Sequence, residues 1–177
     1  MRQKLLKYLL NDRGVSLLET LVTLVLLSVL AILSAPLIKS SEPFDFRVNR
    51  IASQLRLSRA RAISQTTAYR IMASSNNQFV IDKANSCTAT TWTRDSYFQS
   101  EDLRLSTARE VSAGEGARLT QARVNNTVAS PVTNWSICYD SRGITSTDLL
   151  LSFQDLTTSE IIRIQVFAGG ALQVYGN

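Results

Sequence analysis

The stretch that decides the fold is residues 12–33, "DRGVSLLETLVTLVLLSVLAIL", in which a short polar, basic segment leads into a long apolar run. After Glu19 there are 19 consecutive residues without a charge. As a helix they would span about 28 Å, close to the hydrocarbon thickness of a bilayer. Ordinary signal peptides have a shorter apolar core, and a proline directly after Ala35 disfavours the usual cleavage there. The sequence therefore predicts a transmembrane helix over residues 15–38.

The net charge of +5 is concentrated near the N-terminus. Residues 1–14 hold four basic side chains and one acidic side chain, so this short segment carries most of the excess. Basic residues ahead of an apolar span keep that end in the cytoplasm. We therefore expect a single-pass protein of the inner membrane whose C-terminal part is exported. Because the excess has this local explanation, the overall charge is weak evidence for a nucleic-acid partner.

Glu19 needs an explanation, because a carboxylate costs about 2.5–3.5 kcal/mol at the centre of a transmembrane helix and less near the interface. Two explanations remain open. In the first, Glu19 lies at the cytoplasmic edge and its side chain reaches the interface. In the second, a cut between Gly14 and Val15 creates an α-amino group that is positive near neutral pH. That amine would pair with Glu19, four residues along the same helix or in an adjacent subunit.

This segment resembles the leader and N-terminal helix of type IV prepilins, known as the class III prepilin signal. In that family a short basic leader ends in glycine, a hydrophobic residue follows, and glutamate is the fifth mature residue. The resemblance implies that a prepilin peptidase removes residues 1–14 after Gly14 and methylates Val15, which stands where phenylalanine is commoner. It also implies that Glu19 acts in assembly and that Pro36 kinks the helix. The implied partners are other pilin or pseudopilin subunits, the peptidase and an inner-membrane assembly platform.

Residues 39–66 are predicted to form the exported, amphipathic half of this helix, after a polar stretch around Pro43 where the helix is expected to bend or loosen. Apolar residues recur there at helical spacing, and we expect this face to pack on a globular domain. The face consists of Val48, Ile51, Ala52, Leu55 and Ala62.

The same helix carries five arginines. Arg47, Arg50 and Arg61 cluster on a second face that is expected to be exposed, and Arg56 lies apart from them. Three roles remain open for these four residues: a solvated surface, contacts with neighbouring subunits, and binding of DNA phosphates. Arg59 projects toward the apolar face. Because a buried guanidinium needs a carboxylate or several carbonyl partners, we predict that Arg59 forms a structural ion pair within the β-rich domain or at its seam.

Residues 67–177 are predicted to form a β-rich domain. The predicted fold class is therefore α+β with antiparallel strands, and the pilin-like family resemblance implies that the long N-terminal helix packs on a β-sandwich-like domain. "TAYRIMAS" and "QFVIDKA", separated by "SNN", predict a hairpin. "NWSICYD", "DLLLSF", "IIRIQVF" and "ALQVYG" predict strands joined by short turns in an antiparallel sheet. Residues 84–130 are harder to interpret, although "TWTRDSYF" and "ARLTQARV" are candidate strands.

The order of these segments resembles the GspH/FimT group, the minor pseudopilins of type II secretion and minor pilins of type IV pili. The likeness rests on "LRLSRARAI", "ICYDSRGI" and "IIRIQVFAGGALQV". Some FimT-like proteins bind DNA during natural transformation through a C-terminal GRxR motif. Here residues 169–172 are "GGAL", and without cations this loop is not expected to bind phosphates. The better DNA-binding candidates are Arg47, Arg50, Arg56 and Arg61.

The chain has no histidine and two cysteines, Cys87 and Cys138. The first fact excludes histidine-based metal sites and general bases. No nucleotide-binding loop, GxSxG or CxxC pattern is present, and Asp95, Glu101 and Asp102 are expected to be solvated loop charges. We therefore expect no enzyme activity, cofactor or metal. Two cysteines in an exported domain predict one disulfide, with two buried free thiols as the alternative.

The preferred function is that of a minor pilin or pseudopilin, assembled into a type IV pilus or a type II secretion pseudopilus after cleavage. The alternative is a pilus-associated subunit that binds DNA in natural transformation. A third hypothesis is a membrane-anchored exported protein that never polymerises.

Overall fold

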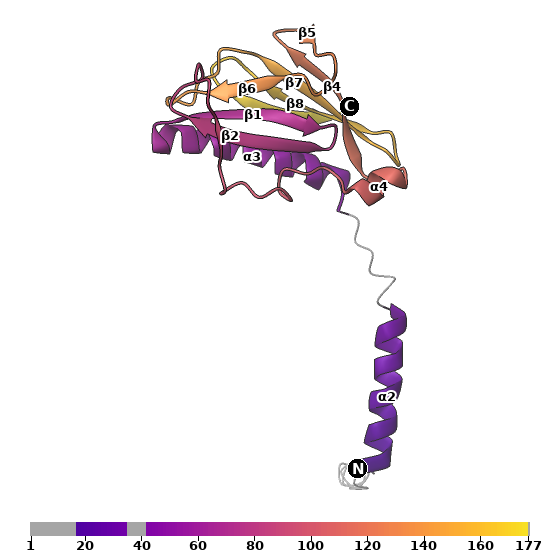
Figure 1. Ribbon diagram of the computed structural model, residues 1–177. Coiled ribbons are helices and arrows are strands. Elements are labelled where there is room, and N and C mark those ends of the chain that lie inside the picture. The colour runs from indigo at the N-terminus through magenta and orange to yellow at the C-terminus, as the bar shows by residue number, and fades with distance from the viewer. Residues whose placement is uncertain (1–16, 35–41, 177) are drawn as a thin grey trace, which may run out of the picture. The chain divides into compact units, whose positions relative to one another are not determined.

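The computed structural model describes residues 17–34 and 42–176, with side chains described for residues 17–28 and 42–176. The chain divides into two compact units, residues 1–41 and residues 42–177, and each is described by itself. The first unit contains the helix α2 (Leu17–Ser34), and the second contains α3, α4 and two antiparallel sheets (Figure 1). The structure is therefore mixed α+β, as the sequence predicts.

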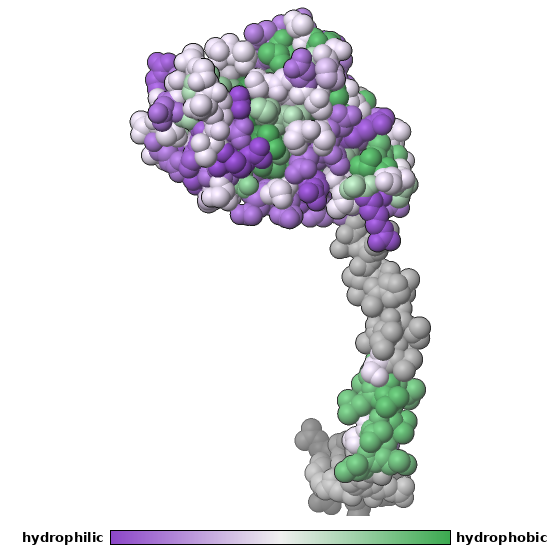
Figure 2. All heavy atoms as spheres, viewed as in Figure 1, coloured by the Kyte–Doolittle hydropathy of each residue, from purple (hydrophilic) through white to green (hydrophobic). Residues whose placement is uncertain are grey.

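α2 is rich in leucine and valine, and the hydroxyl side chains of its described part, residues 17–28, are satisfied within the helix. Thr20, Thr23 and Ser28 each donate a hydrogen bond of 2.7–2.9 Å to the carbonyl three residues earlier. Such bonds let a polar side chain sit in apolar surroundings. All the large apolar side chains described on α2 are exposed, and they cover its described part in Figure 2: Leu17, Leu18, Leu21, Val22, Leu24, Val25, Leu26 and Leu27.

Within the described residues, no helix is both long enough and apolar enough to cross a membrane. The transmembrane segment predicted over residues 15–38 extends beyond the described residues at both ends.

α3 (Phe44–Gln65) is the long helix of the second unit and lies within the predicted segment 39–66. It begins after Pro43, whose fixed φ and missing N–H suit a helix start. It ends at Thr66, which has a φ of 54° and donates its N–H to the carbonyls of Ala62 and Ile63. The predicted apolar face is buried, which confirms its assignment: Val48, Ile51, Ala52, Leu55 and Ala62.

The first sheet has the strand order β3-β2-β1-β6, and each strand pairs antiparallel with its neighbour. The predicted hairpin is confirmed, because β1 and β2 pair from Ala68↔Ala84 to Ser75↔Gln78 around a turn at residues 76–77. The candidate strand in "TWTRDSYF" amounts to only the two residues of β3. The strand bounds are β1 (Ala68–Ser75), β2 (Gln78–Ala84), β3 (Thr93–Arg94) and β6 (Ser136–Tyr139).

The second sheet has the order β5-β4-β7-β8-β9, again antiparallel. It contains the predicted strand "ARLTQARV" as β4, and the short helix α4 (Ala108–Ser112) precedes it along the chain. The strand bounds are β4 (Ala117–Val124), β5 (Thr127–Val128), β7 (Leu149–Asp155), β8 (Ile161–Val166) and β9 (Leu172–Gly176).

One predicted connection is wrong. The sequence predicts β6 and β7 in one sheet, on either side of a turn at residues 141–143 (the "SRG" turn), but β6 pairs with β1, whereas β7 pairs with β4 and β8. The turn packs against α3 instead of closing a hairpin. A Cβ atom placed on Gly143 would lie 2.7 Å from the Cδ1 atom of Ile63. The segment between β6 and β7 therefore carries the chain past the helix from one sheet to the other.

Side chains from α3 and both sheets form one hydrophobic core. Phe79 of β2 contacts Phe153 of β7 and Trp135, with ring centroids 6.0 and 5.9 Å apart respectively. All of the buried core residues lie between Phe44 and Val166. Because the second unit contains this core in full, residues 42–177 constitute a domain that can fold without the first unit.

Candidate functional site

The predicted processing and assembly residues fall only partly within the described residues. Glu19 lies in the first turn of α2, where the helix dipole favours a negative charge, and its side chain is exposed. None of the ion pairs among the described residues involves Glu19. Gly14, Val15 and Pro36 lie outside the described residues, so cleavage, methylation and the kink stay predictions.

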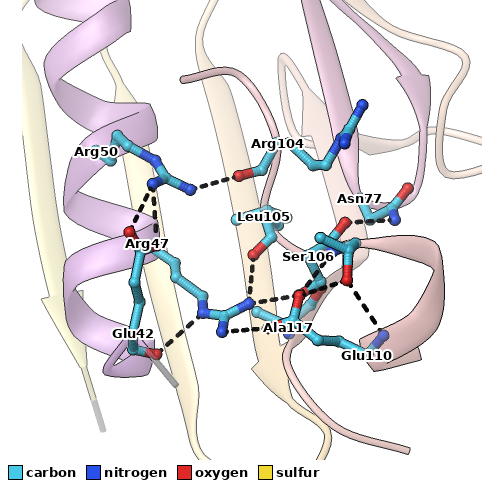
Figure 3. A network of polar contacts seen from close by, with 10 residues as sticks. Glu42, Arg47, Arg50, Asn77, Arg104, Leu105, Ser106, Glu110 and Ala117 are labelled. Carbon is cyan, nitrogen blue, oxygen red and sulfur yellow. Dashed lines mark hydrogen bonds and ion pairs between the residues drawn. The ribbon is translucent and has the colours of Figure 1, made fainter. Parts of the chain in front are cut away.

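Arg47 lies at the centre of a buried polar network, which Figure 3 shows. Its Nε donates to the carbonyl of Glu42 over 3.0 Å, and its Nη1 donates to the carbonyl of Leu105 and to Oγ of Ser106 over 3.0 and 3.2 Å. Its Nη2 lies 2.7 Å from Oε1 of Glu110. Only 6% of the Arg47 side chain is exposed. The expectation that Arg47 lies on an exposed face is therefore wrong, because the segment that leads into α4 covers it.

Glu110 has two structural roles at once. Its Oε2 accepts from the N–H and the hydroxyl of Thr107, while its own N–H donates to Oγ1 of Thr107, which forms a capping box at the start of α4. The hydrogen bond from Arg47 is the main cause that lowers the pKa of Glu110 to about 2. Glu110 is thus charged over the whole physiological pH range and neutralises the buried arginine.

Arg50 contacts the same two parts of the chain (Figure 3). Its Nη1 lies 2.9 Å from Oε2 of Glu42, and its Nη2 donates to the carbonyl of Arg104 over 2.8 Å. Its side chain is 23% exposed, so the expectation of a freely solvated guanidinium is wrong here as well. Together, Arg47 and Arg50 fasten the first turns of α3 to the segment of residues 104–110.

Arg61 faces a second buried carboxylate, Asp95, whose side chain is only 4% exposed. Arg61 Nη2 lies 3.4 Å from Asp95 Oδ2, and its guanidinium stacks over the ring of Tyr97 at 3.9 Å from the centroid. The hydroxyl of Tyr69 lies 2.6 Å from Asp95 Oδ2. Burial alone would raise the pKa of Asp95, but hydrogen bonds from Tyr69 and the Tyr97 N–H, with the charges of Lys83 and Arg61, lower it overall. Asp95 is therefore not the solvated loop charge that was expected.

Arg59 and Arg56 differ from the other three. Arg59 Nε donates to the carbonyl of Gly143 over 2.9 Å, and no carboxylate among the described residues forms an ion pair with it. The predicted ion pair is thus replaced by a carbonyl contact at the seam between α3 and the "SRG" turn. The side chain of Arg56 is exposed. Both arginines line a surface groove with Tyr139 and residues 170–172.

The sequence identifies the arginines of these clusters but not the carboxylates that bind them. Glu110 lies 63 residues from Arg47, and Asp95 lies 34 residues from Arg61, so no local pattern joins them. One signal was present: the spacing of Thr107 and Glu110 is that of a capping box, and it marks the start of α4. Such a signal places Glu110 on a helix, but it does not show which cation it meets.

The predicted disulfide is present between Cys87 and Cys138, whose Cα atoms are 5.8 Å apart. It joins the segment after β2 to the edge strand β6. It closes a loop across a sequence separation of 51 residues. This loop contains most of residues 84–130, the segment whose secondary structure is hardest to predict from the sequence. No cluster of acidic or cysteine side chains within the described residues could hold a metal ion.

Residues 9–35 match the family model of the prokaryotic N-terminal methylation motif, which is the class III prepilin signal. This motif indicates a type IV pilin-like prepilin, a class of protein that prepilin peptidase processes and that assembles with other pilins. The match ends before the second unit begins at Glu42. No curated protein and no solved structure matches the chain significantly.

Proposed function

We propose that this protein is a minor pilin or pseudopilin of the GspH/FimT type, stored in the inner membrane and assembled into a type IV pilus or a type II secretion pseudopilus. The observation that carries the proposal is the methylation motif at residues 9–35. The exposed apolar side chains of α2 support it, because a helix that exposes so many large apolar side chains needs lipid or other helices around it.

The mechanism that we propose is assembly by helix packing. Cleavage between Gly14 and Val15 creates an N-terminal amine, and the carboxylate of Glu19 pairs with an amine of this kind in the same or an adjacent subunit. The apolar stripe of α2 then exchanges lipid contacts for contacts with neighbouring helices. The second unit, with its own core and disulfide, stays folded outside the membrane throughout.

The first test is the mature N-terminus. Mass spectrometry of the protein from cells with prepilin peptidase should find a chain that begins at methylated Val15, and cells without the peptidase should keep residues 1–14. A Gly14→Val variant should remain uncut in both. A mature chain that begins elsewhere, or an uncut chain in the presence of the peptidase, would exclude the proposed processing.

The second test separates assembly from insertion. Glu19→Ala should leave membrane insertion intact and reduce the amount of protein in sheared filaments, since only the assembled state uses the amine–carboxylate pair. Glu101→Ala, which removes an exposed carboxylate of the second unit, serves as the matched control. Equal incorporation of Glu19→Ala and Glu101→Ala would contradict the pairing.

DNA binding in natural transformation is the second candidate function, and it has less support. Phosphate binding requires accessible cations. Of its four candidates, Arg47, Arg50 and Arg61 are bound to carboxylates of their own domain, and Arg56 alone has an exposed side chain. A gel shift of DNA with residues 42–177 at low salt tests DNA binding directly. A shift that disappears as the salt concentration rises would support this second function.

A further inference from the structure

A surface groove of about 640 Å³ lies between the C-terminal half of α3 and the turn that precedes β9. The helix and the turn are more than 100 residues apart in the sequence, and Tyr139 of β6 completes the lining. The apolar part of its lining comes from Ala60, Ile63, Ala171 and Leu172. The polar part comes from Arg56, Arg59 and Tyr139.

The groove carries two positive charges that nothing in its lining neutralises. Arg56 makes no hydrogen bond or ion pair with any described residue, and Arg59 uses only its Nε, which donates to the carbonyl of Gly143. No carboxylate lines the groove. In this respect the groove differs from the Arg47 and Arg61 clusters, where a carboxylate of the same domain is in place. Its electrostatics therefore favour an anionic group from another molecule.

Tyr139 adds a neutral hydrogen-bond donor beside the two arginines. The residue is fully buried, and its hydroxyl has no hydrogen-bond partner in the part of the chain that the structure describes. Burial raises the pKa of Tyr139 to about 12, an effect that the charge of Arg59 partly opposes. The hydroxyl is therefore protonated at physiological pH. A buried hydroxyl without a partner is costly, so Tyr139 leaves an unsatisfied polar atom beneath the two arginine-bearing turns of α3.

The wall of the groove opposite the helix is held in place. Gly169 and Gly170 both have left-handed φ values, of 93° and 90°. The N–H of Gly170 donates to Phe167 over 2.8 Å, and the N–H of Gly169 donates to Thr145 over 2.9 Å. A Cβ atom on Gly170 would collide with the carbonyl oxygen of Gly143 and would lie 3.0 Å from Nε of Arg59, so glycine is needed there for this close approach. The groove is therefore formed before any ligand binds.

β9 makes one side of this region suitable for a peptide. It is an edge strand of the second sheet, and among the described strands it pairs only with β8. An edge strand presents unpaired backbone N–H and C=O groups, which an extended peptide can match. Apolar lining residues such as Ile63 and Leu172 suit side chains of a peptide and offer nothing to a phosphate backbone.

We infer that this groove binds an extended peptide segment of another protein, with one acidic side chain held by Arg56 and Arg59 and apolar side chains seated over Ile63 and Leu172. The site belongs entirely to the second unit. The inference therefore does not depend on cleavage at Gly14 or on filament assembly.

The experiment uses residues 42–177, the domain that contains the whole core, and a capped pentapeptide with a central aspartate between leucine and valine. NMR titration should shift the amide signals of residues 169–172 and those around Arg59. The same peptide with asparagine in place of aspartate should bind about tenfold more weakly, because a hydrogen bond to a charged group is stronger than one to a neutral amide.

Substitutions of single arginines test which positive charges hold the peptide's aspartate. Arg56→Gln should weaken binding of the aspartate peptide several-fold with an unchanged melting temperature, because the exposed side chain makes no hydrogen bond or ion pair with any described residue. Arg59→Gln should weaken binding as well. Arg118→Gln, at an exposed arginine of β4 outside the groove, should leave binding unchanged.

Four results would overturn the inference. The first is equal affinity for the aspartate and asparagine peptides, and the second is unaltered binding by Arg56→Gln. The third is tighter binding of a single-stranded oligonucleotide at the same signals, which would make the groove a nucleic-acid site. Absence of any shift at millimolar peptide concentration would also exclude it.

Discussion

Glu110→Gln is the most informative single substitution in the second unit, because it removes the charge that neutralises the buried Arg47 with little change of shape. Glutamine can still accept a hydrogen bond from Arg47, and it also serves in a capping box with Thr107. The variant therefore isolates the electrostatic part of the contact from packing and helix capping.

The magnitude follows from the pKa of Glu110, which Arg47 and Thr107 lower from 4.5 to about 2. This difference corresponds to about 3 kcal/mol of unfolding free energy. Because 27% of the Glu110 side chain is exposed, screening by water reduces the expectation to about 2 kcal/mol. The pKa is lower in the folded state, so the stabilisation is complete above the unfolded pKa of about 4.5 and is lost as the pH falls toward 2.

The assay is urea denaturation of residues 42–177 and of its Glu110→Gln variant, at a series of pH values between 7 and 2.5. We expect the variant to be less stable by about 2 kcal/mol at pH 7, and we expect the two stability curves to converge in acid. Glu101→Gln, at an exposed position, controls for the loss of a carboxylate. A Glu110→Gln difference that is below about 0.5 kcal/mol at pH 7 would refute the reasoning, as would one that does not change with pH.

The other predictions concern packing and covalent linkage in the same domain. Replacing Cys87 and Cys138 with serine should lower the unfolding free energy by about 4 kcal/mol, and reductant should have the same effect on the unmodified domain in urea denaturation. Gly143→Ala should cost about 2–3 kcal/mol, whereas Gly114→Ala should cost only about 1 kcal/mol. Both glycines have a φ near 70°, but a Cβ atom would collide with a side chain only at Gly143. Tyr139→Phe should raise the melting temperature, with a gain of about 1 kcal/mol, because it removes a buried hydroxyl that has no partner.

Local patterns predicted the elements of the fold well. The hairpin of β1 and β2 needs only two β-rich runs and a short turn, all within 17 residues, and its position was found from the sequence. The buried face of α3 follows from the 3.6-residue period. The disulfide needed no geometry, since two cysteines in an exported domain have one partner each.

Partners across the sequence were not predictable in the same way. The helical period gave the direction of Arg47 and Arg61 correctly relative to the apolar face, but it cannot show that another segment covers them. That segment comes from residues 84–130, which have no clear period because they are mostly turns and short elements. The separation of β6 and β7 into two sheets was missed for a related reason: a turn between strands does not reveal whether they pair.

The groove beside β9 is another feature that the sequence alone does not predict. The sequence places Arg56 and Arg59 on different faces of one helix, and residues 169–172 lack the arginines of a GRxR motif. The tertiary fold brings these parts together and supplies from α3 the cations that are missing from the loop. The charge of this region therefore follows from the residues that line it in three dimensions and not from a motif along the chain.

The Arg47 network also has a mechanical consequence. The chain joins the second unit at Glu42, and the carbonyl of this residue accepts from Arg47 while its carboxylate holds Arg50. Tension applied to the N-terminal segment therefore reaches the domain where α3 is tied to residues 104–110. The hydroxyl of Ser106 in this segment donates to the carbonyl of Ala117 and accepts from its N–H at the start of β4. A pull on the N-terminal segment is therefore passed through residues 104–110 to the second sheet.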